Sequence, residues 1–288
     1  MYEPRFDFVQ CISSAGTHRM AYVQWGDPAN DQVIVCVHGL TRCARDFDRL
    51  AQALAPKFRV VCPDVVGRGQ SDWLKNPMLY GFTQYISDMF TLLARINSRR
   101  LMWLGTSMGG LIGLGVAAQE NSPITRLILN DVGPKIEVAS LLRIGSYLGK
   151  ATLFESFEAA VDYIQAISAS FGQHTSEEWR ELTRYVVRQT PNGWVLHYDP
   201  AIALPFGAVT PAQASATEAL FWQGWAAIKA KTLIIRGQNS DLLAPSTLAQ
   251  MLALNPHASS IQIPNVGHAP TFMHEDQIQI VTDFFQGE

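Results

Sequence analysis

The stretch LMWLGTSMGGLIGLGVAAQ, from Leu101 to Gln119, carries no charged side chain, and its interpretation decides the fold. It is long enough to cross a bilayer, and Gly105, Gly109 and Gly113 recur at every fourth residue, as in the pairing faces of membrane helices. The same residues can instead form a buried strand, a sharp turn at GTSMG and a helix. That pattern exposes a nucleophilic serine, here Ser107.

The composition of this stretch and of the whole chain favours the turn. The stretch holds five glycines together with Thr106 and Ser107, so it is less hydrophobic than a span rich in leucine or isoleucine. The chain has 288 residues, of which 48% are hydrophobic and 16% charged, as is typical of a soluble globular protein with one large core. We therefore expect a strand, a turn and a helix here, and no membrane span.

Charge and cysteine content narrow the classes of partner. The formal net charge is −3 and the basic residues are scattered, so neither nucleic acid nor an anionic membrane is an expected partner. Glu3 and Asp7 interrupt the N-terminal stretch where an export signal needs an apolar core. The four cysteines form no CxxC pair, which favours buried free thiols in a reducing compartment. We expect a cytoplasmic protein, a monomer or a homodimer, that binds a small molecule.

Alternation of strands and helices predicts an α/β fold. An opening hairpin, RFDFVQCIS and HRMAYVQWG, is followed by apolar runs that alternate with helical stretches, which indicates a largely parallel sheet flanked by helices. The expected buried strands are QVIVCVHG, FRVVCPD, RLMWLGT, ITRLILND, KTLIIRG and SSIQIP. Residues 1–134 and 229–288 should form this core domain.

Between these two parts the alternation stops, and residues 135–228 are expected to form an inserted helical cap. SFEAAVDYIQAISASFG begins with Ser156 as an N-cap and ends at Gly172. TSEEWRELTRYVVRQTPNG begins with a capping box of Thr175 and Glu178 and is expected to be helical. TEALFWQGWAAI is a third candidate helix.

Ser107 is the candidate nucleophile. Glycines two residues before and after it give the strained turn room, and the helix that follows directs its unpaired amides at the same point. The Met108 amide is therefore a candidate donor to the oxyanion formed when Ser107 attacks a carbonyl. The second donor is expected from the loop VHGL, with the Leu40 amide favoured and Thr41 as an alternative.

A serine hydroxyl needs a base and an acid that orients it. His268, in the loop IPNVGHAP after a late strand, is the candidate base. Asp241, in GQNSD, lies between Ser107 and His268 in the chain and is the favoured acid; Asp131, at the end of LILND, is its rival. The other histidines show no HxH or HExxH spacing, so no metal site is expected.

These motifs together resemble the α/β-hydrolase fold superfamily. HGL, DVVGRGQSD, GTSMGG, GQNSD and GHAP occur in the order that this family shows, and the likeness covers nearly the whole chain outside residues 135–228. The sequence is similar to the cap-bearing serine esterases and enol-lactonases of the superfamily. The resemblance implies a mostly parallel eight-stranded sheet and a Ser-His-Asp triad that works without a cofactor. Dehalogenases and epoxide hydrolases of this fold use an aspartate nucleophile, and Ser107 argues against both.

The predicted function is that of a carboxylesterase. Its substrates would be small-molecule esters with small to medium, mainly uncharged acyl groups, cleaved through an acyl-enzyme. The alternative is a lactone or carbon–carbon bond hydrolase with the same triad. A non-catalytic binding protein is disfavoured because all three triad positions are filled. Trp222 and Trp225 are expected to line the substrate pocket. Arg42 is a candidate partner for a substrate carboxylate, with an ion-paired or solvated side chain as the alternative.

Overall fold

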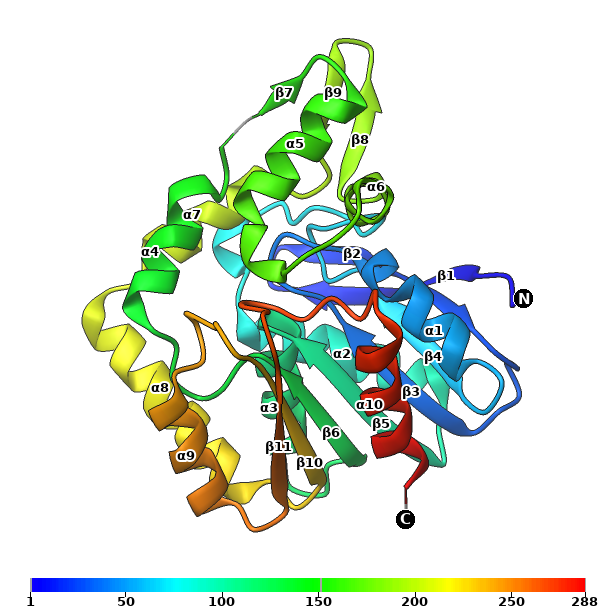
Figure 1. Cartoon of the computed structure of the whole chain (residues 1–288), viewed down its shortest axis with the longest axis vertical. Coiled ribbons are helices and arrows are strands. Elements are labelled where there is room, and N and C mark those ends of the chain that lie inside the picture. The colour runs from blue at the N-terminus through cyan, green and yellow to red at the C-terminus, as the bar shows by residue number, and fades with distance from the viewer. Residues whose placement is uncertain (1, 151, 288) are drawn as a thin grey trace.

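An eight-stranded sheet organises the chain, with the strands in the spatial order β1-β2-β4-β3-β5-β6-β10-β11 (Figure 1). The structure, a computed structural model, describes residues 2–150 and 152–287. The strands are β1 (Arg5–Ser13), β2 (Gly16–Trp25), β3 (Gln32–Val37), β4 (Arg59–Pro63), β5 (Arg100–Thr106), β6 (Ile124–Asn130), β10 (Lys231–Gly237) and β11 (Ala258–Ile263). β1 pairs with β2 and β2 with β4 in antiparallel fashion, and the other pairs are parallel. The predicted fold, with its mostly parallel eight-stranded sheet, is confirmed.

Helices cover both faces of this sheet, as the alternation along β3 shows. Val33 and Val35 pack in one core with α2 (Phe82–Ile96) and α3 (Met108–Ala117). Ile34 lies in the opposite core. Because successive strand residues point to opposite faces, an apolar run of this kind needs cover on both sides. The other helices of the core domain are α1 (Asp48–Leu54), α9 (Pro245–Leu254) and α10 (Glu275–Gln286), with the short 3₁₀ helices η1 (Ala44–Phe47) and η2 (Pro77–Leu79).

The uncharged stretch from Leu101 to Gln119 divides at Ser107. β5 ends at Thr106 and α3 begins at Met108, so the expected strand, turn and helix are confirmed. Within the described ranges, none of the helices combines the length and apolar character that crossing a membrane requires. A Cβ atom on Gly109 would overlap the carbonyl oxygen of Val37, so this glycine lets α3 approach β3.

Residues 135–228, termed the inserted segment, lie between β6 and β10. Most of this segment projects from one end of the sheet, whereas its last helix packs against α3 and α9 (Figure 1). Its elements are α4 (Val138–Tyr147), β7 (Leu153–Phe154), α5 (Phe157–Ile167), η3 (Ala169–Phe171), α6 (Ser176–Arg184), β8 (Val187–Thr190), β9 (Gly193–Leu196), η4 (Pro200–Ile202), α7 (Ala203–Gly207) and α8 (Pro211–Ala227). Ser156 caps α5, and Thr175 and Glu178 form the predicted capping box of α6.

The expectation of a purely helical segment is wrong, because strands β7, β9 and β8 form a small sheet. The predicted helix from Thr175 ends at Arg184, and the residues after it form the hairpin of β8 and β9. β-branched valines favour strands, and Gly193, with a φ of 133°, provides the left-handed residue at the turn.

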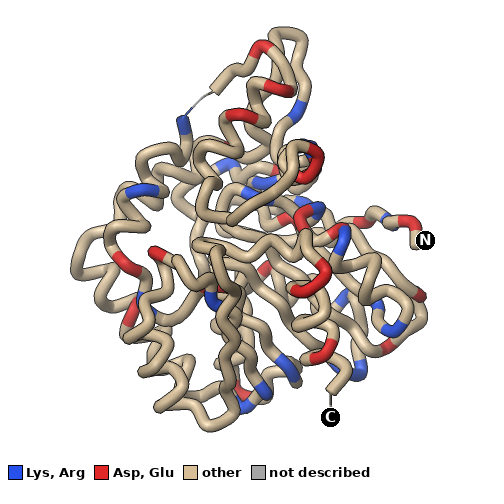
Figure 2. The backbone as a smooth tube through the Cα atoms, in the orientation of Figure 1, with Lys and Arg blue, Asp and Glu red and all other residues tan. Residues whose placement is uncertain are grey.

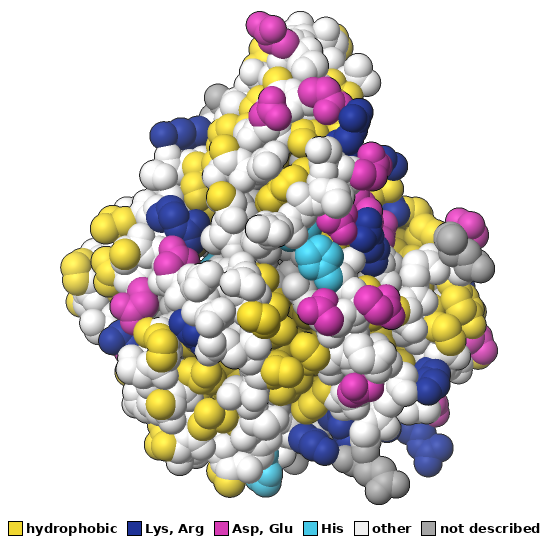
Figure 3. Space-filling view, viewed as in Figure 1, with side chains coloured by type: hydrophobic (Ala, Val, Ile, Leu, Met, Phe, Trp, Pro, Cys, Tyr) yellow, Lys and Arg dark blue, Asp and Glu magenta, His cyan; other side chains and the backbone are white. Residues whose placement is uncertain are grey.

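The distribution of charged residues and the state of the cysteines agree with what the composition predicts. Basic and acidic residues are interspersed along the chain (Figure 2), and the face in Figure 3 mixes both signs with hydrophobic and polar side chains. Cys11, Cys36, Cys43 and Cys62 are free and buried, as expected. The cytoplasmic location drawn from them stays a prediction, as does the oligomeric state.

Replacing Gly109 by alanine should destabilise the protein by about 1–3 kcal/mol, because the new methyl group overlaps backbone and forces α3 away from β3. Urea unfolding measures this change. Gly207→Ala is the matched control, since nothing lies within 4 Å of a Cβ at that position. Equal unfolding free energies for the two variants would contradict this account of the turn.

Candidate active site

Ser107 occupies a strained turn at the carboxyl end of β5. Its φ is 53°, a left-handed value that residues other than glycine rarely adopt. The strain is held by hydrogen bonds: the Ser107 amide donates to the Asn130 carbonyl over 3.0 Å, and the amides of Gly110 and Leu111 donate to the Ser107 carbonyl. The side chain faces a pocket at this end of the sheet.

His268 lies against Ser107, as predicted. Its Nε2 is 2.9 Å from Ser107 Oγ, and its Nδ1 is 2.7 Å from Asp131 Oδ2. A carboxylate accepts only, so Nδ1 carries the hydrogen and Nε2 is left to accept from the serine hydroxyl. The imidazole is therefore fixed in the tautomer that a general base requires.

Several hydrogen bonds hold Asp131 in place. Its side chain is fully buried, and its Oδ1 accepts from the Gly237 amide over 2.8 Å. Its Oδ2 accepts from the Ser240 hydroxyl over 2.6 Å as well as from His268. The Asp131 amide donates to the Ile235 carbonyl at 2.7 Å, so this residue is fastened to the end of β10.

The expectation that Asp241 orients His268 is wrong. Both Asp241 carboxylate oxygens accept from Arg143, at 2.8 and 3.0 Å. Burial raises the pKa of Asp241, but the hydrogen bonds and charge of Arg143 outweigh this effect, and the pKa falls below its ordinary value.

The sheet order explains why Asp131 takes this place. β6 neighbours β5, so the residue that follows β6 lies beside Ser107. Asp241 lies beyond the end of β10, in a turn whose carbonyl accepts from Ser140 of α4. The chain order serine, aspartate, histidine is satisfied by both candidates and does not distinguish them.

The two expected oxyanion donors come from the residue after Ser107 and from the loop after β3. Met108 is the first residue of α3 and has no earlier helical carbonyl to bond, and Leu40 lines the pocket. Among the described residues, neither amide has a hydrogen-bond acceptor. Both are free to donate to a bound group.

His38 holds the Leu40 loop. Its Nδ1 lies 2.7 Å from the Gly39 carbonyl, to which it donates, and its Nε2 accepts from the Val65 amide over 2.9 Å. Burial lowers the pKa of His38 to about 3, so the ring stays neutral in this arrangement. The contacts of His38 therefore hold the backbone of this loop in place.

Arg68 supports the same loop, a role that was not predicted from the sequence. This fully buried side chain donates from Nε to the Leu40 carbonyl over 2.9 Å and from Nη1 to the Tyr85 hydroxyl over 3.0 Å. Its Nη2 contacts the sulfur of Met108 at 3.5 Å. One guanidinium thus touches both residues whose amides flank Ser107. The sequence feature that could have pointed to this role of Arg68 is its position in the motif DVVGRGQSD.

Arg42 lines the pocket as expected and is also ion-paired. Its Nε and Nη2 donate to the two Asp46 oxygens, at 2.7 and 2.8 Å, and Nη2 also donates to the Leu182 carbonyl at 2.7 Å. The inserted segment contributes further lining residues, namely Arg143, Ile144, Tyr147, Ile167, Ser168, Phe171 and Leu182.

The expectation that Trp222 and Trp225 line the pocket is wrong. Trp225 is fully buried and donates to the Met251 carbonyl, and Trp222 donates to Glu218 within α8. α8 packs on α3 where Gly224 lies close to Ala118, the residue after the last turn of α3. Since α3 has ten residues and begins at the pocket, this contact lies about 15 Å along the helix from Ser107. Neither tryptophan is among the residues that line the pocket.

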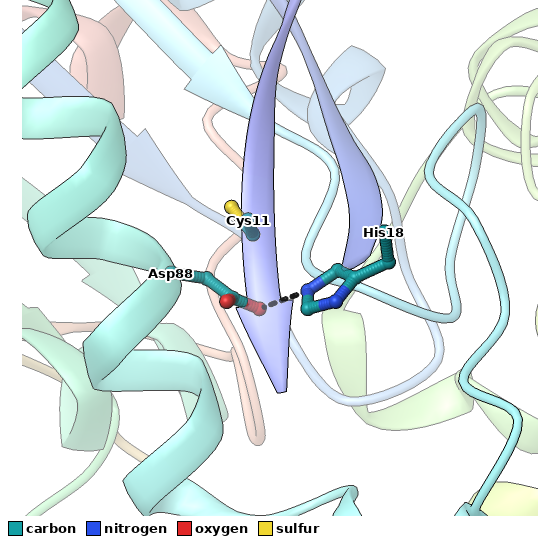
Figure 4. Close-up of side chains that lie close together, drawn as sticks. All are labelled: Cys11, His18 and Asp88. Atoms are coloured by element: carbon teal, nitrogen blue, oxygen red, sulfur yellow. Dashed lines mark hydrogen bonds and ion pairs between the residues drawn. The ribbon is translucent and has the colours of Figure 1, made fainter. Parts of the chain in front are cut away.

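One cluster outside the pocket carries groups that can bind metals (Figure 4). Cys11, His18 and Asp88 are buried, and their ligand atoms lie within 4.8 Å of one another. Asp88 already accepts from His18 at 3.0 Å and from Gln84 at 2.7 Å. Burial, with Asp88 nearby, raises the pKa of the Cys11 thiol to about 12, whereas a metal ligand must be a thiolate. These polar contacts therefore connect the β1–β2 hairpin to α2.

Comparison with known proteins agrees with this fold. The model of the alpha/beta hydrolase fold family matches residues 32–275, and the chain belongs to that family. It is 53% identical to a 3-hydroxybutyrate-oligomer hydrolase of Cupriavidus necator, over 99% of this chain and 98% of that protein. A solved putative hydrolase of Rickettsia typhi is 33% identical with a TM-score of 0.89, and each chain is covered to 99%. An α/β hydrolase of Novosphingobium aromaticivorans is also 33% identical, with a TM-score of 0.85, 99% of this chain and 98% of that one being covered.

The two aspartates should differ in their effect on stability. Asp131→Ala leaves the buried Gly237 amide without its acceptor and places alanine at a φ of 55°, so we expect a loss of about 1–3 kcal/mol. Asp241→Ala removes an ion pair whose side chains are 36% and 43% exposed, and the expected loss is below about 1 kcal/mol. Urea unfolding of both variants checks the order, and a larger loss for Asp241→Ala would contradict it.

Proposed function

We propose that this chain is a serine hydrolase that cleaves carboxylic esters through an acyl-enzyme. The observation that carries the proposal is the continuous line of hydrogen bonds from Ser107 through His268 to Asp131, with distances of 2.9 and 2.7 Å. A serine hydroxyl is activated when a base lies within hydrogen-bond distance of it and a third group orients that base.

In the first half of the reaction Ser107 Oγ attacks the ester carbonyl while His268 Nε2 takes its proton. Asp131 accepts from Nδ1 and stabilises the imidazolium that forms. The Leu40 and Met108 amides donate to the oxyanion, and they need no rearrangement because neither has a protein acceptor among the described residues. His268 then protonates the departing alcohol.

In the second half His268 takes a proton from water, which attacks the acyl-enzyme at the same carbonyl. The Ser107 oxygen leaves and regains its hydrogen from His268. The carboxylic acid product departs from the pocket. Every proton transfer in this scheme uses groups of this chain and water.

The substrate class is drawn from the relative named above. We propose that the chain acts on short linear esters of 3-hydroxybutyrate, the class in the name of a protein 53% identical over nearly its whole length. Such an ester has an uncharged acyl part, in keeping with the apolar lining given by Ile144, Ile167 and Phe171. The inserted segment, which supplies these side chains, is proposed to act as the cap of the site.

Replacing Ser107 by alanine should lower hydrolysis of 4-nitrophenyl butyrate and of the 3-hydroxybutyrate dimer on the order of 10⁴-fold or more, because no nucleophile remains. A fluorophosphonate should label the wild type at this residue and leave the variant unlabelled, as mass spectrometry of the digested protein will show. Ser87→Ala, an exposed change on α2, is the control. Full activity in the Ser107 variant would refute the nucleophile.

The two aspartates can be compared directly in catalysis. Asp131→Asn should lower kcat on the order of 10⁴-fold, because an amide favours the wrong imidazole tautomer. Asp241→Asn should lower kcat by less than about 10-fold, because that carboxylate is paired with Arg143 and exposed. Steady-state kinetics on the same esters decides between them, and the reverse order would return the role to Asp241.

A further inference from the structure

Arg42 has one polar group that the protein leaves unused. Its Nε and Nη2 are bonded to Asp46 and to the Leu182 carbonyl, whereas Nη1 has no hydrogen-bond acceptor among the described residues. The side chain is only 10% exposed, and the residue lines the pocket. A nitrogen with two free N–H groups on so buried a guanidinium side chain is a strong donor to an anionic oxygen.

Asp46 keeps this guanidinium in place. The two contacts use the edge formed by Nε and Nη2, a bidentate geometry that fixes the plane of the group. Leu182 of α6 fixes the remaining hydrogen of Nη2 from the side of the inserted segment. The free Nη1 is therefore preorganised, and it can contact one carboxylate oxygen without breaking any bond that holds Arg42.

Arg42 is also close to the nucleophile. A point one bond from the Gly39 Cα, where a side chain would begin, lies 3.7 Å from Arg42 Cγ and 3.8 Å from Ser107 Cβ. In an ester formed on the hydroxyl of 3-hydroxybutyrate, two carbons separate the ester oxygen from the free carboxylate carbon. With carbon–carbon bonds of about 1.5 Å, that spacing is roughly 4 Å. An ester bond at Ser107 thus brings such a carboxylate to the neighbourhood of Arg42.

The other arginine of the pocket is differently placed. Arg143 gives Nε and Nη2 to Asp241, and both side chains of this pair are more than a third exposed. Water screens such a pair and competes for the same donors. A substrate carboxylate gains more from the sheltered Nη1 of Arg42 than from Arg143.

We propose that Arg42 determines specificity by binding the free carboxylate of the departing hydroxy acid, so that the enzyme prefers the ester bond next to a free carboxyl end. Asp46 is the positioning residue. This inference rests on the proposed ester hydrolysis and adds the part of the substrate that is recognised.

The test compares two substrates that differ only in this charge: the linear dimer of 3-hydroxybutyrate and the methyl ester of its free carboxyl group. In both substrates the measured reaction is cleavage of the internal ester bond. The wild type should cleave this bond in the dimer acid with a kcat/KM about 10- to 100-fold higher than in the methylated dimer, as expected for a hydrogen bond to a charged group. In Arg42→Gln/Asp46→Asn, which removes the pair together and leaves no unpaired buried charge, this ratio should fall to about one.

The neighbouring pair Arg45 and Asp48 provides the matched control. It has a similar fork, with a contact of 2.8 Å between Arg45 Nε and Asp48, but neither residue lines the pocket. Arg45→Gln/Asp48→Asn should therefore keep the wild-type ratio. Arg42→Lys, which retains the charge and loses the fork, should give an intermediate ratio and serves if the double variant does not fold.

The outcomes separate the two proposals. If the wild type cleaves neither substrate nor 4-nitrophenyl butyrate, ester hydrolysis itself is refuted and this inference falls with it. If the wild type cleaves both dimer substrates equally well, ester hydrolysis stands and carboxylate recognition is overturned. A wild-type preference that survives in Arg42→Gln/Asp46→Asn, or that is lost equally in the Arg45 control, overturns the assignment to Arg42.

Discussion

The close approach of α3 to the central strands is the constraint on which the site depends. β5 must reverse into a helix within one residue, and the helix must then pass over the end of β3, where Gly109 meets the Val37 carbonyl. No side chain fits between them, so the contact is made backbone to backbone. In this turn Ser107 has a left-handed φ of 53°, and the amide of Met108, the next residue, has no acceptor among the described residues. The proposed nucleophile and one proposed oxyanion donor thus both lie at this close contact between α3 and β3.

Buried polar groups extend this arrangement outward. Arg68 joins the Leu40 carbonyl to the Tyr85 hydroxyl on α2, and His38 joins Gly39 to Val65. Both side chains are fully buried, where every unpaired donor or acceptor is costly. Their bonds therefore allow the Leu40 loop few alternative conformations. Buried hydrogen bonds hold the core side of the pocket, and the inserted segment supplies part of its lining.

Local sequence patterns identified the features that depend on neighbouring residues. Glycine spacing identified the turn at Ser107, and capping residues identified the starts of α5 and α6. Local patterns could not identify the carboxylate partner of His268, because that partner depends on which strands are neighbours in the sheet. Both aspartates follow a strand and precede His268 in the chain, and only the placement of β6 beside β5 selects Asp131. The tryptophans of α8 were misplaced for a similar reason, since an aromatic side chain does not indicate which helix end it faces.

The contact between the inserted segment and the histidine loop links two parts of the molecule that are far apart in the chain. Ser170 accepts from the Gly267 amide over 2.7 Å and donates from its hydroxyl to the His268 carbonyl over 2.5 Å. An outward swing of η3 would break both bonds and release the backbone that carries the imidazole. Exchange of this segment between relatives, by recombination or by design, therefore transfers part of the support of the proposed catalytic histidine along with the pocket lining. A chimera without a serine at position 170 would have a changed pocket lining and would also lose the hydroxyl that donates to the His268 carbonyl.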